Sequence, residues 1–249
     1  MDLKVQPGEK GKVSMPLIPE RHTAPEFLDL SPEAYALEEL EGSLADIRVI
    51  NRYLGDCPAL LKHLAELAKG LSGFTLLDIA TGSADIPIAI VEWARRRGVG
   101  AAITAVDINE QTVEIARRHA AGFPEITVEA ADGLSLPYPD KSFDFVLCSK
   151  TAHHLSNDEA VRLVSEMLRV AKKGYLIMDL RRSWIAYTLI CLLTRIFTRN
   201  RLTRYDGPLS VLKSFTAAEL SAVARDAGAS RFTVFREPFW LLVLAGEIS

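Results

Sequence analysis

Cysteine is scarce in this chain of 249 residues, which excludes the protein classes that are built on it. The three cysteines, Cys57, Cys148 and Cys191, lie far apart and form no Cys-x-x-Cys pair, so neither a disulfide framework nor a zinc site is expected. An excess of one charge is also absent, because the formal net charge is only -3, and this balance indicates no nucleic-acid partner. We therefore expect a cytoplasmic protein with reduced thiols and no bound metal.

Long hydrophobic runs are missing as well. The longest run covers residues 184–197 and includes Arg195, whereas a membrane-spanning helix needs roughly 20 apolar residues. Residues 1–20 carry scattered lysine, glycine and proline without an apolar core, so no secretory signal is expected, and we interpret residues 1–30 as a flexible tail. What is present, 49% hydrophobic and 24% charged residues, is ordinary for a globular domain.

Apolar runs alternate with amphipathic segments from residue 74 onward. Strands are predicted at residues 74–80, 102–107, 126–130, 143–149 and 175–179, with helices between them at 86–97, 110–121 and 157–172. A further helix begins near Thr216, and two more strands are predicted at 231–236 and 240–244. This order is typical of βαβ units around a mostly parallel sheet, and it predicts the α/β class.

Helical segments precede and interrupt this pattern. Residues 31–33, Ser-Pro-Glu, supply an N-cap hydroxyl, a proline for the first turn and an acid, and they open a predicted helical cap over residues 31–72. An apolar stripe at residues 44–54 indicates that this cap packs on the main domain, although a substrate lid is an alternative. The main domain is predicted over residues 73–249, with a helical lid insertion at about 182–212.

The turn after the first predicted strand is the most informative stretch of the sequence. Residues 77–85, Leu-Asp-Ile-Ala-Thr-Gly-Ser-Ala-Asp, run from an apolar strand through small residues into a helix. Small residues let a ligand approach the backbone, and the first N–H groups of the helix favour an electron-rich group. The second strand ends in Asp107, where an acid in a Rossmann unit accepts hydrogen bonds from ribose hydroxyls. The pair predicts a nucleoside cofactor.

Two classes of cofactor fit such a turn. Dinucleotide dehydrogenases use a GxGxxG pattern, whose positions here would be Ala80, Gly82 and Asp85. The third position should be tiny so that the helix can lie close to the strand, and Asp85 is not. A carboxylate there favours a cofactor with positive groups, such as the ammonium and sulfonium of S-adenosylmethionine. A nicotinamide-dependent oxidoreductase is the weaker alternative.

Four segments in series resemble the motifs of class I methyltransferases. Residues 77–84 are similar to VLDxGxGxG, with alanine in place of two glycines, and residues 105–109 are similar to xGxDxSxxML. Residues 130–137 resemble xxxDAxxLPF, and residues 142–155 resemble FDxVxxxxxLHH. The likeness extends to the branch that includes ubiquinone and menaquinone biosynthesis methyltransferases. It implies a Rossmann-like fold whose seven-stranded, mostly parallel sheet has an antiparallel C-terminal strand.

The resemblance also implies S-adenosylmethionine as the cofactor and assigns residues to it. Asp107 would hold the ribose, Ile108 would border the adenine, and Asp132 would meet the adenine amino group. Asp78 would contact the cofactor directly, and the alternative is a structural role in which its carboxylate accepts hydrogen bonds from the backbone of the turn. The complete set of predicted cofactor-binding residues is Asp78, Ala80, Thr81, Gly82, Ala84, Asp85, Asp107, Ile108, Ala131, Asp132, Gly133, Ser149 and Lys150.

Methyl transfer from a sulfonium is an in-line displacement, so alignment of the reactants can supply up to roughly 7 to 11 kcal/mol of the acceleration. A hydroxyl acceptor would also benefit from a base. His153 and His154 follow the fourth strand, at the carboxyl edge of the sheet, and we predict that they are the catalytic residues. Packing, or capping of the following helix, is an equal alternative. A carbon acceptor activated by its own phenol would need neither histidine.

The segment after the fifth strand is both apolar and basic, which suits a small aromatic, polyketide-like or quinone-like acceptor, methylated on oxygen or carbon. The predicted substrate-binding residues are His154, Arg181, Trp184, Tyr187 and Tyr205. A homodimer interface and peripheral contact with an anionic membrane are the open alternatives for this segment. A noncatalytic regulatory or scaffold protein that binds S-adenosylmethionine is the open alternative for the whole chain.

Overall fold

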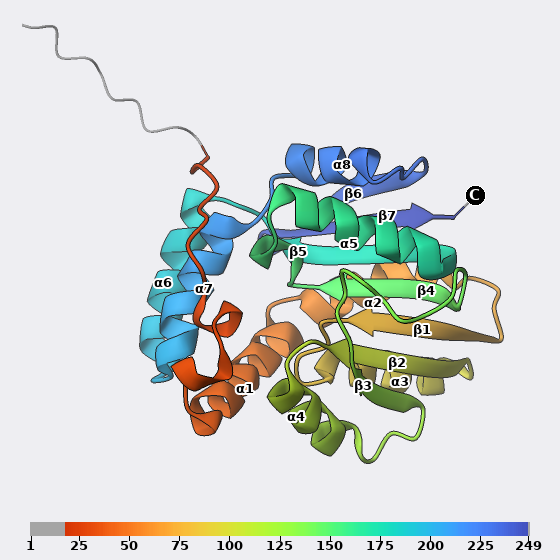
Figure 1. The fold of residues 1–249 in the computed structure, drawn as a ribbon, viewed down its shortest axis with the longest axis horizontal. Coiled ribbons are helices and arrows are strands. Elements are labelled where there is room, and N and C mark those ends of the chain that lie inside the picture. The colour runs from red at the N-terminus through yellow and green to blue at the C-terminus, as the bar shows by residue number, and fades with distance from the viewer. Residues whose placement is uncertain (1–17, 249) are drawn as a thin grey trace, which may run out of the picture.

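The computed structural model describes residues 18–248 and places them around a seven-stranded sheet of order β3-β2-β1-β4-β5-β7-β6 (Figure 1). The strands are β1 (Gly73–Ile79), β2 (Gly100–Asp107), β3 (Ile126–Ala130), β4 (Phe143–Ser149), β5 (Ala171–Leu180), β6 (Phe232–Glu237) and β7 (Leu241–Glu247). The pairings from β3 to β5 are parallel, whereas β7 is antiparallel to both of its neighbours. The Rossmann-like α/β fold predicted from the sequence is confirmed.

Helices connect these strands and precede them. They are α1 (Leu37–Tyr53), α2 (Asp56–Leu67), α3 (Asp85–Arg97), α4 (Glu110–Ala120), α5 (Asn157–Val170), α6 (Trp184–Phe197), α7 (Arg201–Lys213) and α8 (Ala217–Asp226). Three short 3₁₀ turns are η1 (Phe27–Asp29), η2 (Pro32–Ala34) and η3 (Ala152–His154). The capping boxes of α5 and α8 form, so their side chains satisfy backbone N–H groups that a helix start leaves unpaired.

The core consists of two layers because successive side chains of a strand point to opposite faces of the sheet. In β1, Leu76 packs with residues of α2 and α3 on one face, and Leu77 packs with residues of α5 and α8 on the other. Both leucines are fully buried. A parallel sheet that is covered on both faces leaves its strand ends as the place where a ligand can enter.

Residues 18–30 differ from the predicted flexible tail over residues 1–30, of which residues 1–17 lie outside the described part. The Arg21 side chain donates hydrogen bonds to the backbone oxygens of Lys213 and Leu155, at 2.7 and 2.6 Å, and its guanidinium lies 3.8 Å from the centre of the Phe215 ring. Glu26 is only 1% exposed. The reason is tertiary, because the partners come from α7, η3 and the residues beside them, which lie far along the chain.

Helices α6 and α7 form the predicted helical insertion after β5 and lie beside α1 at one end of the sheet (Figure 1). The apolar run at residues 184–197 forms α6, and this helix turns one apolar stripe outward. Ile185, Leu189, Leu192 and Ile196 on this stripe are between 41% and 62% exposed. Within residues 18–248, no helix has the length and apolar character that crossing a membrane requires.

The packing of β7 on β5 yields a test of the fold. A Cβ atom at Gly246 would lie 2.3 Å from the Tyr175 ring, which is fully buried, so Gly246→Ala should destabilise the protein by about 1 to 3 kcal/mol. Gly122→Ala is the matched control, because a Cβ there meets no atom within 4 Å, and it should change stability by less than about 0.5 kcal/mol. Urea unfolding measures both, and equal stabilities would contradict the β5–β7 register.

Candidate active site

A cavity of about 1170 Å³ lies at the carboxyl ends of β1, β2 and β4. Its floor is the turn between β1 and α3, and its walls come from α1, α6, α7 and residues 23–30. A volume of this size is enough for a nucleoside cofactor and a second small molecule. The position is also the expected one, since ligands of open α/β sheets bind outside the carboxyl ends of the strands.

The backbone of the β1–α3 turn takes an unusual conformation. Ala80, Gly82 and Ala84 have φ angles of 56°, 57° and 60°, in the left-handed region that side chains disfavour. The backbone of the turn is open to a ligand at Gly82, since a Cβ there would meet only the Leu44 side chain, at 3.8 Å. Ala80 and Ala84 therefore adopt the conformation at the two positions where the methyltransferase motif VLDxGxGxG has glycine, and the turn keeps its shape.

The carboxylate of Asp107 joins this turn to the end of β2. Its Oδ2 accepts a hydrogen bond from the Gly82 N–H at 3.1 Å, and its Oδ1 accepts one from the Asn109 N–H at 3.0 Å. Burial raises the pKa of Asp107, and these backbone donors oppose the rise without cancelling it. Each carboxylate oxygen retains a second lone pair, so it can accept a hydrogen bond from a ligand hydroxyl.

Buried polar groups line the floor of the cavity. Asp78 is 2% exposed, and burial together with the neighbouring carboxylates of Asp85 and Asp107 raises its pKa to about 7. The Ser149 hydroxyl is buried and makes no hydrogen bond within the described residues, whereas the Thr81 hydroxyl interacts with Asp78 and opposes the rise of its pKa. Because buried polar groups are normally satisfied, the Ser149 hydroxyl fits a site that a polar ligand completes.

A chain of polar side chains extends from the floor into the N-terminal helices. Asn51 donates a hydrogen bond to Asp85 at 2.8 Å and accepts one from the Lys150 ammonium at 2.9 Å, and Lys150 also forms an ion pair with Asp56 at 2.7 Å. Sequence reasoning missed Asn51 and Asp56. Their signal was a polar residue on the apolar stripe of α1 and an acid at the start of α2.

The His153 ring is held in one orientation by Asp179. The backbone N–H of His153 lies 2.9 Å from Asp179 Oδ2, and its ring Nδ1 lies 2.7 Å from Asp179 Oδ1. Burial would raise the pKa of Asp179, but these interactions with His153 outweigh it and keep the pKa below its usual value. An ionised carboxylate only accepts hydrogen bonds, so Nδ1 of His153 carries a proton, and Nε2 lies on the side of the ring that faces Glu26.

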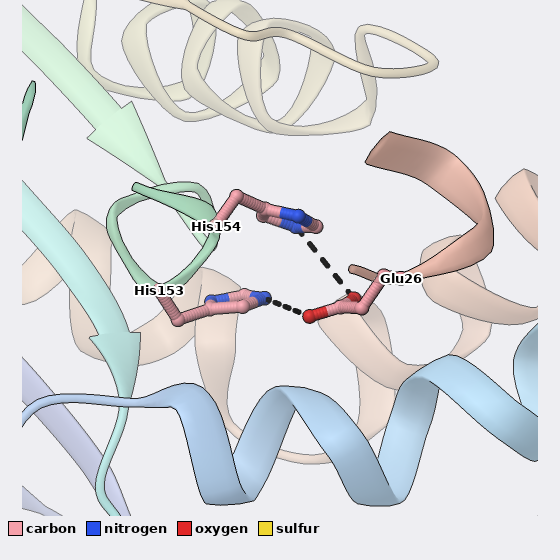
Figure 2. Close-up of side chains that lie close together, drawn as sticks. All are labelled: Glu26, His153 and His154. Atoms are coloured by element: carbon pink, nitrogen blue, oxygen red, sulfur yellow. Dashed lines mark ion pairs between the residues drawn. The ribbon is translucent and has the colours of Figure 1, made fainter. Parts of the chain in front are cut away.

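His154 and Glu26 lie beside this pair, as Figure 2 shows. His154 donates from Nδ1 to Asp29, and its Nε2 lies 3.8 Å from Glu26 Oε2. Lys213 forms ion pairs with Asp29 at 2.7 Å and with Glu26 at 3.3 Å. Burial lowers the pKa of His154, but the carboxylates of Asp29 and Glu26 raise it to a larger extent. Sequence reasoning missed Glu26 and Asp29 because it treated residues 1–30 as a tail.

The cavity brings together most of the residues that the sequence assigned to the cofactor, and it also contains the two predicted catalytic histidines, His153 and His154. The cofactor residues that line it are Asp78, Ala80, Thr81, Gly82, Asp85, Asp107, Ile108, Ser149 and Lys150.

Four predicted cofactor residues lie outside the lining: Ala84, Ala131, Asp132 and Gly133. Ala84 is fully buried under α4, and Asp132 is exposed and accepts a hydrogen bond from the Leu134 N–H. A Cβ at Gly133 would lie 2.5 Å from Ile79, so this glycine packs on the sheet. The segment still borders the site, since the Ala131 N–H bonds to the Asp107 carbonyl at 3.0 Å.

The predicted substrate residues divide in the same way. His154 lines the cavity, whereas Arg181, Trp184, Tyr187 and Tyr205 do not. Tyr205 is 50% exposed and meets the edge of Phe27, and Trp184 packs against Tyr187. The packing of α6 on α7 turns another face inward, and that face supplies Ile190, Thr194, Thr203, Asp206, Gly207, Ser210, Val211 and Lys213.

Comparisons with known proteins agree with this geometry. Residues 77–178 match the model of the family described as a methyltransferase domain. The chain is 28% identical over 122 residues to a demethylmenaquinone methyltransferase of Staphylococcus epidermidis, covering 49% of this chain and 48% of the relative. It is 36% identical over 105 residues to a ubiquinone/menaquinone biosynthesis C-methyltransferase of Geobacter sulfurreducens, covering 41% of this chain and 39% of the relative. The matches thus span about half the length of such relatives or less.

Solved structures share the fold at lower sequence identity. A SAM dependent methyltransferase from Aquifex aeolicus superposes with a TM-score of 0.62 at 20% identity, covering 86% of this chain and 100% of that one. Magnesium protoporphyrin IX methyltransferase from Synechocystis, solved with bound SAH, has a TM-score of 0.56 at 15% identity, covering 88% of this chain and 89% of that one. Likeness at this level concerns the fold.

The raised pKa of Asp78 predicts a pH-dependent cost to stability. Between its usual pKa of 3.8 and about 7 the folded protein binds more protons than the unfolded chain, so stability is lost as pH rises through this window. Asp78→Asn removes this ionisation. Relative to wild type, the variant should gain roughly 2 kcal/mol between about pH 5.5 and about pH 8, measured by urea unfolding.

Asp144→Asn is the control for this measurement. Asp144 forms an ion pair with Lys173 and has a pKa below its usual value, so it stays ionised over the same pH range and should add no pH dependence. An identical pH profile for wild type and Asp78→Asn would contradict the assignment.

Proposed function

We propose that this chain, whose residues 77–178 form a methyltransferase domain on a class I fold, binds S-adenosylmethionine and transfers its methyl group to a small molecule. The observation that carries the proposal is the left-handed turn at residues 80–84, whose Gly82 N–H is bonded to Asp107 on the floor of the cavity. A turn and an acid in this relation suit a nucleoside whose ribose and amino-acid portions lie on either side of the strand ends.

The residues of the floor fit the groups of this cofactor. The free lone pairs of Asp107 suit the ribose hydroxyls, and Ile108, which is 71% exposed, offers an apolar surface for the adenine. The carboxylates of Asp78 and Asp85 suit the ammonium group, and Thr81 lies between them in the turn. When bound, the cofactor supplies a methyl group on a positively charged sulfur.

The remaining part of the cavity suits an aromatic, quinone-like acceptor. Apolar side chains on α1 and α6, including Leu44, Ile47 and Ile190, offer one kind of wall, and the two histidines with Glu26 offer a polar end. A ring that carries hydroxyl or carbonyl oxygens matches both surfaces. The name of the Staphylococcus epidermidis relative refers to demethylmenaquinone, and that of the Geobacter sulfurreducens relative refers to ubiquinone/menaquinone biosynthesis, and both names support the same class of acceptor.

The residues of the chain contribute orientation and proton handling. We call the part of the cavity around Glu26, His153 and His154 the acceptor end. Residues 23–30 and α7 cover it, which excludes water and limits the positions that an acceptor can take. Asp179 keeps the His153 proton on Nδ1, so the Nε2 lone pair is available to an acceptor hydroxyl. Removing the proton from a ring hydroxyl raises the electron density on its oxygen and on the ring carbons beside it, so this arrangement can serve oxygen or carbon methylation.

Two substitutions separate cofactor binding from turnover. Asp107→Ala removes the group that orders the turn and faces the ribose, so it should weaken binding of S-adenosylmethionine and of its demethylated product at least about tenfold, measured by calorimetry. His153→Ala should leave this affinity unchanged and reduce kcat by about 10² to 10⁴, measured with methyl-labelled cofactor and quinol or phenol acceptors.

Asp226→Ala, at an exposed position of α8, is the control and should change neither quantity. No affinity of the wild type for either form of the cofactor would refute the proposed function. Cofactor binding without methyl transfer to any acceptor tested would instead favour the noncatalytic alternative.

A further inference from the structure

Three side chains from distant parts of the sequence point their polar atoms at one another at the acceptor end of the cavity (Figure 2). One ligand atom from each of Glu26, His153 and His154 can be chosen so that all lie within 4.8 Å of one another. Nε2 of His153 lies 3.7 Å from Glu26 Oε1, and Nε2 of His154 lies 3.8 Å from Glu26 Oε2. These distances are too long for hydrogen bonds.

The separations suit a shared metal ion. Zinc binds histidine nitrogen and carboxylate oxygen at about 2.1 Å, and two such ligands stand about 3.4 Å apart at the tetrahedral angle. The observed nitrogen-to-oxygen distances, each to a different oxygen of Glu26, exceed this value by only a few tenths of an ångström, so the carboxylate would present one oxygen toward each histidine. We propose that Glu26, His153 and His154 bind one divalent transition-metal ion at the acceptor end of the cavity.

The surroundings of the two histidines support this assignment. Each ring donates from Nδ1 to a carboxylate, His153 to Asp179 and His154 to Asp29. A carboxylate behind each imidazole fixes the tautomer that leaves Nε2 free, and metal-binding histidines are commonly held in this way. Nε2 of each ring is thereby directed at the carboxylate of Glu26, which is buried.

The balance of charge points in the same direction. Glu26, Asp29 and Asp179 are three carboxylates in direct contact with the histidines, and Lys213 is the ammonium that forms ion pairs with two of them. Apart from the histidines, these groups carry a formal excess of two negative charges, in a region where Glu26 and Asp179 are each 1% exposed. Glu26 Oε1 is buried and makes no hydrogen bond to any described residue, and the Lys213 ammonium lies 3.3 Å from it. A divalent cation would neutralise this excess.

The donor set identifies the chemical class of the ion and a use for it. Two imidazoles and one carboxylate favour zinc, iron(II), manganese(II) or cobalt(II) over calcium and magnesium, which prefer oxygen ligands. Three protein ligands leave coordination positions for an acceptor oxygen, which the ion would orient and polarise. With the ion bound, Nε2 of His153 is a ligand, so the lowering of the hydroxyl pKa by the ion would take the place of proton removal by the imidazole. Metal binding itself does not rest on the proposed methyl transfer. The sequence predicted no metal because Glu26 lies far from the two histidines in the chain.

The test uses cobalt(II) and zinc(II) as probes on the full chain after treatment with a chelator. We expect one equivalent of cobalt(II) to bind with a visible d–d absorption band, and one equivalent of zinc(II) to bind in equilibrium dialysis. Glu26→Gln and His154→Ala should each weaken binding at least about tenfold, and Asp29→Asn, behind His154, by about 10- to 100-fold. His63→Ala is the matched control, because it breaks another buried histidine–carboxylate pair, with Glu237 at 2.8 Å, and should leave metal affinity unchanged.

Thermal unfolding shows whether each variant folds and provides a second readout. Zinc should raise the Tm of wild type and of His63→Ala but not that of Glu26→Gln. Absence of stoichiometric binding to wild type, or equal affinity in wild type, Glu26→Gln and His154→Ala, would overturn the metal site. Calorimetry with S-adenosylmethionine on the metal-free protein tests the proposed function separately, so failure of one proposal is distinguishable from failure of the other.

Discussion

The hydrogen bond from the Gly82 backbone to Asp107 is the contact on which the arrangement of the site depends. It joins the turn after β1 to the end of the neighbouring strand β2, so the two places that a nucleoside must reach are fixed relative to each other. The left-handed conformation at Ala80, Gly82 and Ala84 aims the backbone so that this bond can form. Two of these residues are alanines, so the turn includes backbone strain that the surrounding packing must offset.

A second constraint comes from charges buried at the acceptor end. Residues 18–30 pack there because Arg21 and Glu26 find partners on α7, η3 and neighbouring backbone, and their burial without partners would be costly. The same segment covers the cavity and adds Glu26 and Asp29 to the two histidines. Closure of the site and its electrostatic character therefore have one origin, the ionic contacts between the N-terminal segment and the insertion after β5.

The accuracy of the sequence predictions follows the range of the interactions that each one depends on. The predictions for residues 126–130 and 143–149 coincide with β3 and β4, because apolar periodicity and flanking turns are local signals. Ala84 and Asp132 match family motifs but lie outside the cavity lining, since a motif does not specify side-chain direction. Tyr187 and Tyr205 lie outside it because the inward face of α6 and α7 depends on how the two helices pack together.

The sequence by itself determined the order of strands and helices, the small-residue turn around Gly82 and the acid at Asp107, because each of these is encoded within a few neighbouring residues. Only the tertiary structure decided which side chains meet at the acceptor end. Glu26, Asp179 and Lys213 come from three separated segments, and no local pattern marks them as partners. They meet there because buried charges are stable only beside groups that neutralise them, and such groups can come from any part of the chain.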